Sequence, residues 1–298
     1  MRALLALPGV EIPDGVTAAT WDGRSELPDG AEEVEFFVPP FIRPERLRAA
    51  MERMPRLQVV QVMSAGVDSF VGRLPEGVPL CNGRGAQDTA TAELAATLVL
   101  AGQRDLATFT RDQERRTWSP HTTSGLADRT VLILGYGSIG AAIERRLAPF
   151  EAEFLRVARS ARKGVAGLDE LPALLPEADV VVVVLPLTEE TRGLVDKDVL
   201  SAMKDGALLV NIARGTIVDQ DALLAELTAG RLRAALDVTD PEPLPEDHPL
   251  WSAPNLLLTP HVGGNTPALE SRLRILIRDQ LRRWVAGEPL RNVIEGDY

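Results

Sequence analysis

One stretch, TVLILGYGSIGAAIERRL at residues 130–147, restricts the fold of this chain more than any other. A run of β-branched and aliphatic residues leads directly into Gly135, Gly137 and Gly140, and an amphipathic pattern of helical period follows. In a G-x-G-x-x-G turn the first glycine makes a tight turn, the second admits a pyrophosphate, and the third lets helix and strand pack closely. Because strand and helix signals flank the glycines, dinucleotide binding is favoured over a purely structural turn.

The rest of the chain alternates short aliphatic runs with amphipathic helical patterns, which is typical of parallel α/β proteins. Expected strands lie at 34–38, 57–63, 130–137, 153–159, 179–187, 207–214, 234–238 and 255–262. Expected helices lie at 44–54, 139–150, 168–178 and 221–230. The most continuous strands show no polar alternation, so helices should cover both faces of doubly wound parallel sheets.

Two longer helices suggest how domains are connected. An unbroken helix is expected over 88–118, where apolar residues keep helical spacing without a proline, and another over 267–287. The fold class is therefore α/β with two Rossmann-like domains. Residues 93–264 are expected to form a dinucleotide-binding domain, inserted into a discontinuous substrate domain of residues 1–92 and 265–298.

Composition excludes several classes of function. A formal net charge of -11 opposes binding to nucleic acid or to an anionic membrane surface. Cys81 is the only cysteine, so an intrachain disulfide and a thiolate cluster are excluded, and no metal site is expected. The longest apolar run is far shorter than the roughly 20 residues that span a bilayer. The N-terminal apolar stretch is too short for a secretory signal, so a cytoplasmic protein is expected.

The end of the strand after the glycine turn bears on the choice between NAD and NADP. Domains that prefer NAD carry an acidic residue there, which accepts hydrogen bonds from the ribose hydroxyls. Here Ala158 is followed by Arg159, Ser160 and Arg162, which suit an added ribose phosphate. NADP(H) is the preferred cofactor and NAD(H) remains possible. The alternative is that these arginines are solvated loop charges.

Arg214, Glu242 and His261 each follow an expected strand. Carboxyl ends of parallel strands share one edge of a sheet, so these side chains should converge on the cofactor crevice. The arginine can hold a carboxylate and polarise the adjacent carbonyl, and the histidine can protonate that carbonyl while the glutamate bonds its other ring nitrogen. The set predicts reduction of a 2-oxo acid. Taken singly, Arg214 is also compatible with a surface ion pair and Glu242 with a solvated acid.

With these residues identified, the chain resembles the D-isomer-specific 2-hydroxyacid dehydrogenases, and most closely their glyoxylate and hydroxypyruvate reductase branch. The likeness covers nearly the whole length, through segments such as SAGVDSF, TAELAATLVLAGQR, MKDGALLVNIARGTIVD and LDVTDPEPLPEDHPLW. It implies that Arg214, Glu242 and His261 are catalytic, and that backbone N–H groups of Ala65 and Gly66 hold the substrate carboxylate together with Arg214. It also implies a homodimer, in which Trp118 lies either at the interface or in the core.

The same resemblance implies the cofactor contacts. Thr91 is expected at a phosphate and Asp237 near the nicotinamide carboxamide. The full expected set is Thr91, Gly135, Gly137, Ser138, Ile139, Gly140, Arg159, Ser160, Arg162, Leu185, Pro186, Thr191, Ile212, Asp237 and Gly263. One departure is Glu151, which stands where a glycine is usual in that branch.

The expected function is NADP(H)-dependent reduction of a small 2-oxo acid. Formate and phosphonate dehydrogenases share the fold, but the former are expected to carry Gln in place of Glu242. A non-catalytic dinucleotide-sensing scaffold, like the corepressors that resemble these enzymes, is the alternative from another class. Phe41, in the loop FFVPPFIRP, is expected to select the substrate side chain. His121 and His248 are expected to be solvated.

Overall fold

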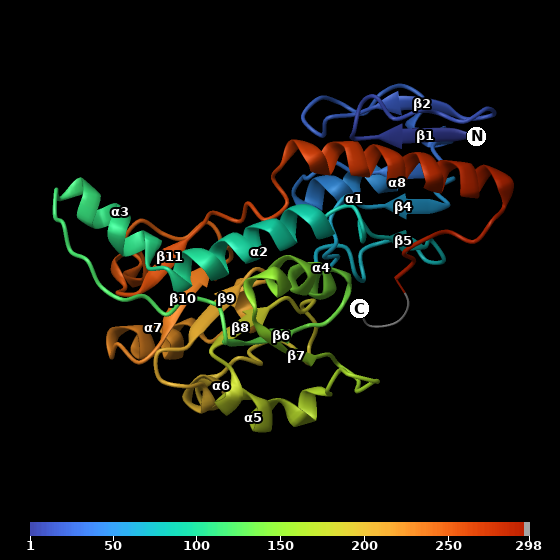
Figure 1. Cartoon of the computed structure of the whole chain (residues 1–298). Coiled ribbons are helices and arrows are strands. Elements are labelled where there is room, and N and C mark those ends of the chain that lie inside the picture. Colours follow the sequence, from blue (N-terminus) through green and yellow to red (C-terminus); the bar gives the residue numbers. More distant parts are fainter. Residues whose placement is uncertain (295–298) are drawn as a thin grey trace. The chain divides into compact units, whose positions relative to one another are not determined.

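The computed structural model describes residues 1–294 of the chain. The chain divides into two compact units, the first of Met1–Gln87 and Thr266–Tyr298 and the second of Asp88–Asn265. Each unit contains one parallel sheet with helices on both faces (Figure 1). The predicted α/β class is therefore confirmed. The sequence expected these divisions after residues 92 and 264.

The first unit is built on a five-stranded sheet with the order β2-β1-β3-β4-β5. Every neighbouring pair in it is parallel. Its strands are β1 (Arg2–Leu5), β2 (Thr17–Thr20), β3 (Phe36–Val38), β4 (Val59–Gln61) and β5 (Leu80–Cys81). The sequence predicted only β3 and β4, which lie within the largely apolar runs at 34–38 and 57–63, and it did not predict β1, β2 and β5.

Two helices cover the two faces of this sheet (Figure 1). Leu4 and Phe37 pack in one core with α1 (Pro44–Glu52). Ala3 and Phe36, the preceding residues on the same strands, pack in the other core with α8 (Pro267–Ala286). This alternation is the period-two geometry of a strand. A short helical turn, η1 (Ala31–Glu33), precedes β3.

The second unit is built on a six-stranded parallel sheet with the order β11-β10-β9-β8-β6-β7. Its strands are β6 (Thr130–Leu134), β7 (Glu153–Val157), β8 (Val180–Val183), β9 (Leu208–Asn211), β10 (Arg233–Leu236) and β11 (Leu256–Leu258). All six were predicted. The chain runs from β6 to β7 on one side and then returns to β8 on the other, which creates a switch point beside the glycine turn. Ligands of open α/β sheets bind at such points.

Helices cover both faces of the second sheet (Figure 1). On one face, Ile133 packs in a core with α2 (Asp88–Gln103) and α4 (Ser138–Leu147). On the other, Leu132 packs in a core with α5 (Leu171–Leu174), α6 (Lys197–Ala202) and α7 (Gln220–Thr228). The remaining short turns are η2 (Ala148–Phe150), η3 (Leu168–Glu170), η4 (Leu175–Glu177), η5 (Gly215–Ile217) and η6 (Pro249–Ser252).

The expectation of one unbroken helix over 88–118 is wrong. Helix α2 ends at Gln103, and α3 (Leu106–Glu114) begins after Asp105, which has a left-handed backbone with φ 51°. Arg233 stabilises the end of α2 at this break, because its guanidinium donates to the carbonyl of Gly102 at 2.8 Å and to the side chain of Gln103. The guanidinium satisfies a carbonyl at the end of α2, where helix carbonyls lack an intrahelical partner.

Two other sequence expectations are refined. The helix expected over 168–178 is the short series η3, α5 and η4, in which prolines occupy early positions of α5 and η4. Glu151 adopts φ 60°, the left-handed conformation that suits the glycine usual at that place. Among the described residues, no helix combines the length and apolar character needed to cross a membrane.

Candidate active site

The predicted catalytic residues of the second unit lie beyond the carboxyl ends of neighbouring strands. Arg214 follows β9, Glu242 follows β10 and His261 follows β11. Since these strands are parallel and adjacent, their ends share one edge of the sheet. The structure therefore brings together three residues that are up to 47 positions apart in the sequence.

The turn after β11 fixes the position of His261. This residue has φ 53°, a left-handed conformation that is uncommon for a side chain other than glycine. Its backbone N–H donates to the carbonyl of Asp237 at 2.8 Å. Asp237 is 2% exposed, and its carboxylate accepts from the Thr259 hydroxyl at 2.6 Å and from the N–H groups of Val262 and Gly263 at 2.9 Å each. A buried carboxylate with three donors thus organises the turn that presents the histidine.

The His261 ring is paired with Glu242. Its Nδ1 lies 2.7 Å from Oε2 of the carboxylate, whose other oxygen accepts the backbone N–H of Thr239 at 3.0 Å. Glu242 raises the pKa of His261 above its ordinary value, against the opposing effects of burial and of the Arg214 charge. Burial acts to raise the pKa of Glu242, but the bonds from His261 and Thr239 outweigh it, so that pKa is lowered. The pair fixes the ring and favours its protonated form.

Arg214 is positioned by its neighbours in the chain. The side chain of Asn211, the last residue of β9, donates to the Arg214 carbonyl at 2.9 Å and accepts the Ala213 N–H at 3.0 Å. The next residue is Gly215, where an added Cβ would overlap the carbonyl of Thr239. Close packing at this glycine therefore brings the Arg214 turn against the segment that leads to Glu242.

The glycine turn after β6 fits a bound pyrophosphate. Gly135 has φ 113°, and a Cβ there would meet the Val184 backbone. A Cβ at Gly140 would lie 2.8 Å from the carbonyl of Gly135. At Gly137 a Cβ would meet no atom within 4 Å, so this glycine faces open space at the start of α4. The three glycines therefore meet the three requirements of the motif. Ser138 and Ile139 are the first residues of α4, and the N-terminus of a helix attracts phosphate.

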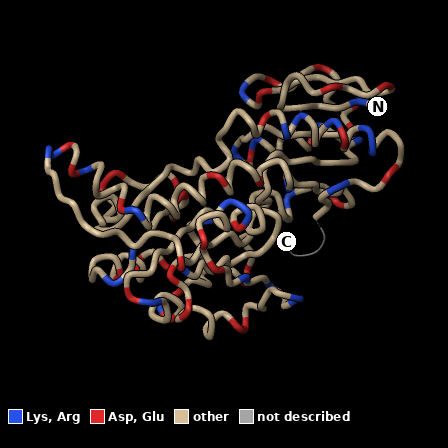
Figure 2. The backbone as a smooth tube through the Cα atoms, in the orientation of Figure 1, with Lys and Arg blue, Asp and Glu red and all other residues tan. Residues whose placement is uncertain are grey.

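Basic residues lie in the turn that follows β7, as the charge colouring shows (Figure 2). Arg159, Ser160 and Arg162 are all exposed there. The Arg162 guanidinium donates to the Tyr136 carbonyl of the glycine turn and lies 6.0 Å from the centre of the Tyr136 ring. Arg156 lies 5.6 Å from the same ring and pairs with Glu144. The structure thus brings one of the predicted arginines to the glycine turn.

The other predicted cofactor residues of this unit are mostly buried. Leu185, Thr191, Ile212 and Gly263 have little exposure, whereas Pro186 is exposed. The Thr191 hydroxyl donates to the Pro186 carbonyl at 2.7 Å and so shapes the loop after β8. A Cβ on Gly263 would lie 3.7 Å from the Thr91 methyl, which places Thr91 of α2 beside the histidine turn.

The predicted substrate loop lies in the first unit, after β4. The Asn82 side chain donates to the Ala65 carbonyl at 2.7 Å, and the Ser64 hydroxyl donates to the Gly66 carbonyl at 2.6 Å. The Ala65 N–H, expected to hold a substrate carboxylate, donates to Oε1 of Gln87 at 3.0 Å. A side chain of the protein therefore already accepts from this amide.

The other two histidines make contacts that the sequence did not predict, although His121 is exposed as expected. His121 Nε2 lies 3.0 Å from the Asp105 carboxylate, and the ring stacks on Phe109 with centroids 4.7 Å apart. His248 Nδ1 accepts the Leu250 N–H at 3.3 Å and caps η6. Among residues 1–294, no group of three or more His, Cys, Asp and Glu side chains is arranged to hold a metal ion.

Sequence reasoning missed several residues that hydrogen-bond to predicted site residues. They are Asn211, Thr259, Asn82 and Gln87. The sequence could have indicated Asn211, because a polar amide at the end of a continuous aliphatic strand needs a hydrogen-bond partner. The partners of the other three lie 17 to 22 positions away and depend on the fold.

Comparison with known proteins gives three findings. Residues 96–263 match the family model described as "D-isomer specific 2-hydroxyacid dehydrogenase, NAD binding domain". The human glyoxylate reductase/hydroxypyruvate reductase is 36% identical over 250 residues, which cover 78% of this chain and 76% of that protein. A crystal structure of a D-isomer-specific 2-hydroxyacid dehydrogenase from Xanthobacter autotrophicus, in complex with NADPH and MES, is similar with a TM-score of 0.84 and 32% identity. That match covers 99% of this chain and 97% of the other.

A second solved structure is also similar to this chain. It is an NADPH-dependent glyoxylate/hydroxypyruvate reductase from Sinorhizobium meliloti, in complex with NADP and sulfate. The TM-score is 0.83 at 26% identity, and the match covers 99% of this chain and 98% of that one.

Proposed function

The chain belongs to the D-isomer-specific 2-hydroxyacid dehydrogenases, and on this premise we propose that it reduces small 2-oxo acids of the glyoxylate and hydroxypyruvate type, with NADPH preferred over NADH. The observation that carries the proposal is the 2.7 Å contact between His261 Nδ1 and Glu242 at the carboxyl edge of the sheet. Relatives named for these two substrates support the choice of acid.

In this reaction the protein supplies a proton and fixed charge. His261 donates the proton from Nε2 to the substrate carbonyl oxygen, and Glu242 holds Nδ1 and raises the pKa of the ring, which favours its protonated form. Arg214 binds the substrate carboxylate and polarises the carbonyl, together with backbone N–H groups of Ala65 and Gly66. The nicotinamide cofactor supplies the hydride when it is bound.

NADPH preference is proposed from charge near the glycine turn. Arg159, Ser160 and Arg162 offer two guanidiniums and a hydroxyl after β7, and Ala158 stands where NAD-preferring domains carry an acid. The glycine geometry fits the pyrophosphate that both cofactors share. The arginines therefore bear only on the choice between the two cofactors.

We also propose a homodimer formed through α3 and the segment that follows it. Helix α3 has no buried residue, and Trp118 is 95% exposed, so this tryptophan is not part of the core. A hollow of about 620 Å³ is lined by Phe109, Arg116, Trp118 and Pro120. Exposed aromatic surface of this kind is typical of interfaces. Sedimentation analysis is expected to give a dimer, and Trp118→Ala is expected to shift it toward monomer.

The function is tested by following nicotinamide absorbance with NADPH or NADH and a panel from glyoxylate to phenylpyruvate. We expect turnover with the small acids and a higher kcat/KM for NADPH. His261→Ala should lower kcat by roughly a hundred- to ten-thousand-fold while leaving cofactor binding intact. An active His261→Ala protein would contradict the proton-donor role. A wild-type protein that binds the cofactor but reduces none of the acids would instead favour the dinucleotide-sensing scaffold.

A further inference from the structure

We propose that Gln87 gates the substrate-carboxylate loop by occupying the Ala65 amide, so that it sets the affinity of the enzyme for 2-oxo acids. This inference rests on the proposed function, which assigns the carboxylate to the Ala65 and Gly66 amides. The orientation of the Gln87 amide follows from its neighbour, because an N–H donor must face the carbonyl oxygen of the glutamine and not its nitrogen.

The loop itself is held rigidly, which leaves the Gln87 side chain as the part able to move. Asn82 donates to the Ala65 carbonyl at 2.7 Å, and the Gly83 N–H donates to the Ser64 carbonyl at 2.7 Å. Asn82 is 6% exposed. Its backbone carbonyl accepts from the side chain of Gln61, which is fully buried, at 3.0 Å.

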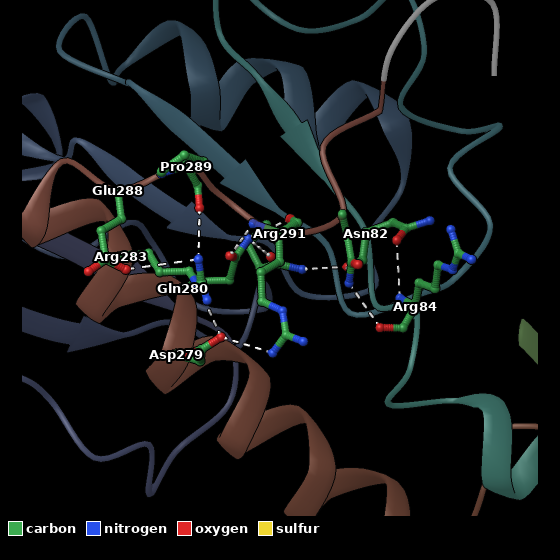
Figure 3. A network of polar contacts seen from close by, with 10 residues as sticks. Asn82, Arg84, Asp279, Gln280, Arg283, Glu288, Pro289 and Arg291 are labelled. Atoms are coloured by element: carbon green, nitrogen blue, oxygen red, sulfur yellow. Dashed lines mark hydrogen bonds and ion pairs between the residues drawn. The ribbon is translucent and has the colours of Figure 1, made fainter.

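A network of side-chain amides links Asn82 to the C-terminal segment (Figure 3). Gln280 of α8, also fully buried, donates to Gln61 at 2.8 Å and accepts the Arg291 N–H at 2.8 Å. Asn292 donates to the carbonyls of Asn82 and Arg84 at 3.2 and 2.9 Å. Because Gln61, Asn82 and Gln280 of this network are buried and share several hydrogen bonds, displacing the loop would break several of these bonds together.

Gln87 is held more weakly than the loop. Its oxygen accepts from Ala65 at 3.0 Å, while its Nε2 makes a long 3.4 Å contact with the Met63 carbonyl. A substrate carboxylate is charged and is a stronger acceptor than a neutral amide oxygen. The carboxylate therefore displaces Gln87 from the amide, and the displaced hydrogen bond reduces the net affinity.

The test compares Gln87→Ala with Gln87→Glu in the full-length enzyme. Removing the competing acceptor should lower KM for glyoxylate, and the dissociation constant of the unreactive analogue oxamate, by about 3- to 10-fold with kcat nearly unchanged. The glutamate variant places a negative charge at the amide and should raise both constants by more than about tenfold, an effect that added salt reduces. A gate therefore predicts that the two variants change KM and the oxamate dissociation constant in opposite directions. A purely structural role for Gln87 does not predict that Gln87→Ala lowers these constants.

Gln58→Ala is the matched control, because Gln58 is an exposed glutamine of the same unit that bonds Glu35 and the Trp284 indole. It should leave both constants unchanged. If Gln87→Ala remains active but its KM for glyoxylate and its dissociation constant for oxamate are unchanged or raised, the proposal that Gln87 is a gate is wrong. The proposed function is not affected by that result. If wild type reduces no 2-oxo acid, the proposed function fails, and the gate fails with it.

Discussion

Two turns at the carboxyl edge of the second sheet are built in opposite ways. The turn after β11 is anchored by the buried Asp237 and presents His261 from a left-handed backbone. The turn after β7 leaves Arg159, Ser160 and Arg162 exposed, with a bond from Arg162 to the glycine turn. Proton transfer requires atoms fixed to a fraction of an ångström, whereas a phosphate is attracted by charge over a longer range.

This difference predicts different responses to mutation. Changes in the anchored turn should alter stability, kcat and pH dependence together, because one hydrogen-bonded group supports another. Changes in the exposed turn should alter the cofactor constants alone. The following variants are arranged from the largest expected effect to the smallest.

Asp237→Ala should have the largest effect. It removes the acceptor of the Thr259 hydroxyl and of the Val262 and Gly263 N–H groups. Leaving these buried and half-buried donors without a partner should lower the free energy of unfolding by about 2–4 kcal/mol, and the displaced histidine should lower kcat by roughly a hundredfold. Urea unfolding and steady-state kinetics measure the two. Asp247→Ala, an exposed acid in the same unit, is the control. A stable, fully active Asp237→Ala enzyme would show that the turn does not depend on this anchor.

Glu242→Gln should lower kcat by about tenfold and change the pH profile. Glu242 raises the pKa of His261, so reduction should persist above the ordinary histidine pKa of about 6.5 and decline as pH rises through the raised value. Without the carboxylate charge that decline should move to lower pH. Glu246→Gln, an exposed acid of the same loop, should leave the profile in place. If the decline of activity at high pH occurs at the same pH in Glu242→Gln as in wild type, Glu242 does not control the protonation of His261.

The same pair makes stability depend on pH. The raised pKa of His261 contributes stability at pH below its unfolded value, and this is lost as pH rises through the folded value. The lowered pKa of Glu242 contributes stability above its unfolded value, which is lost as pH falls through the folded value. The contribution of the pair should therefore be largest at mildly acidic pH, and Glu242→Gln should flatten this dependence in thermal unfolding.

The double variant Arg159→Ala, Arg162→Ala should raise KM for NADPH by about tenfold and leave KM for NADH nearly unchanged. Its kcat should stay close to wild type, since these side chains are exposed and remote in sequence from His261. Arg145→Ala, an exposed arginine of α4, controls for the loss of positive charge. Equal losses with both cofactors would mean that the arginines act through the glycine turn that the cofactors share.

Glu151→Gly should have the smallest effect, and only on stability. Glu151 has φ 60°, so glycine removes a left-handed strain of roughly 1 kcal/mol. The residue lies outside both turns, and the kinetic constants should not change. If Glu151→Gly changes kcat or KM, catalysis also depends on the stability of parts of the unit outside the two turns.

The sequence predicts the second unit better than the first. Its continuous aliphatic runs and glycine spacing follow from local rules, and the positions of Arg214, Glu242 and His261 at strand ends follow from parallel topology. Strands β1, β2 and β5 lie outside the apolar runs that were interpreted as strands, so they were not predicted. The helix break at Asp105 depends on Arg233, a residue 128 positions later, and the Gln87 bond depends on where β4 and β5 bring their loops. Contacts of this kind arise only from the assembled fold.

The late position of α8 in the chain has a consequence for synthesis. Ala3, Leu5 and Phe36 need Leu273, Ile277 and Leu281 of α8 to complete their core. The ribosome makes these helix residues only after it has synthesised the whole of Asp88–Asn265. The second unit is contiguous and can fold during translation, while the nascent first unit keeps one apolar sheet face uncovered until the end. Chains truncated before Pro267 should therefore bind chaperones and aggregate, even though they contain His261 and the complete glycine turn.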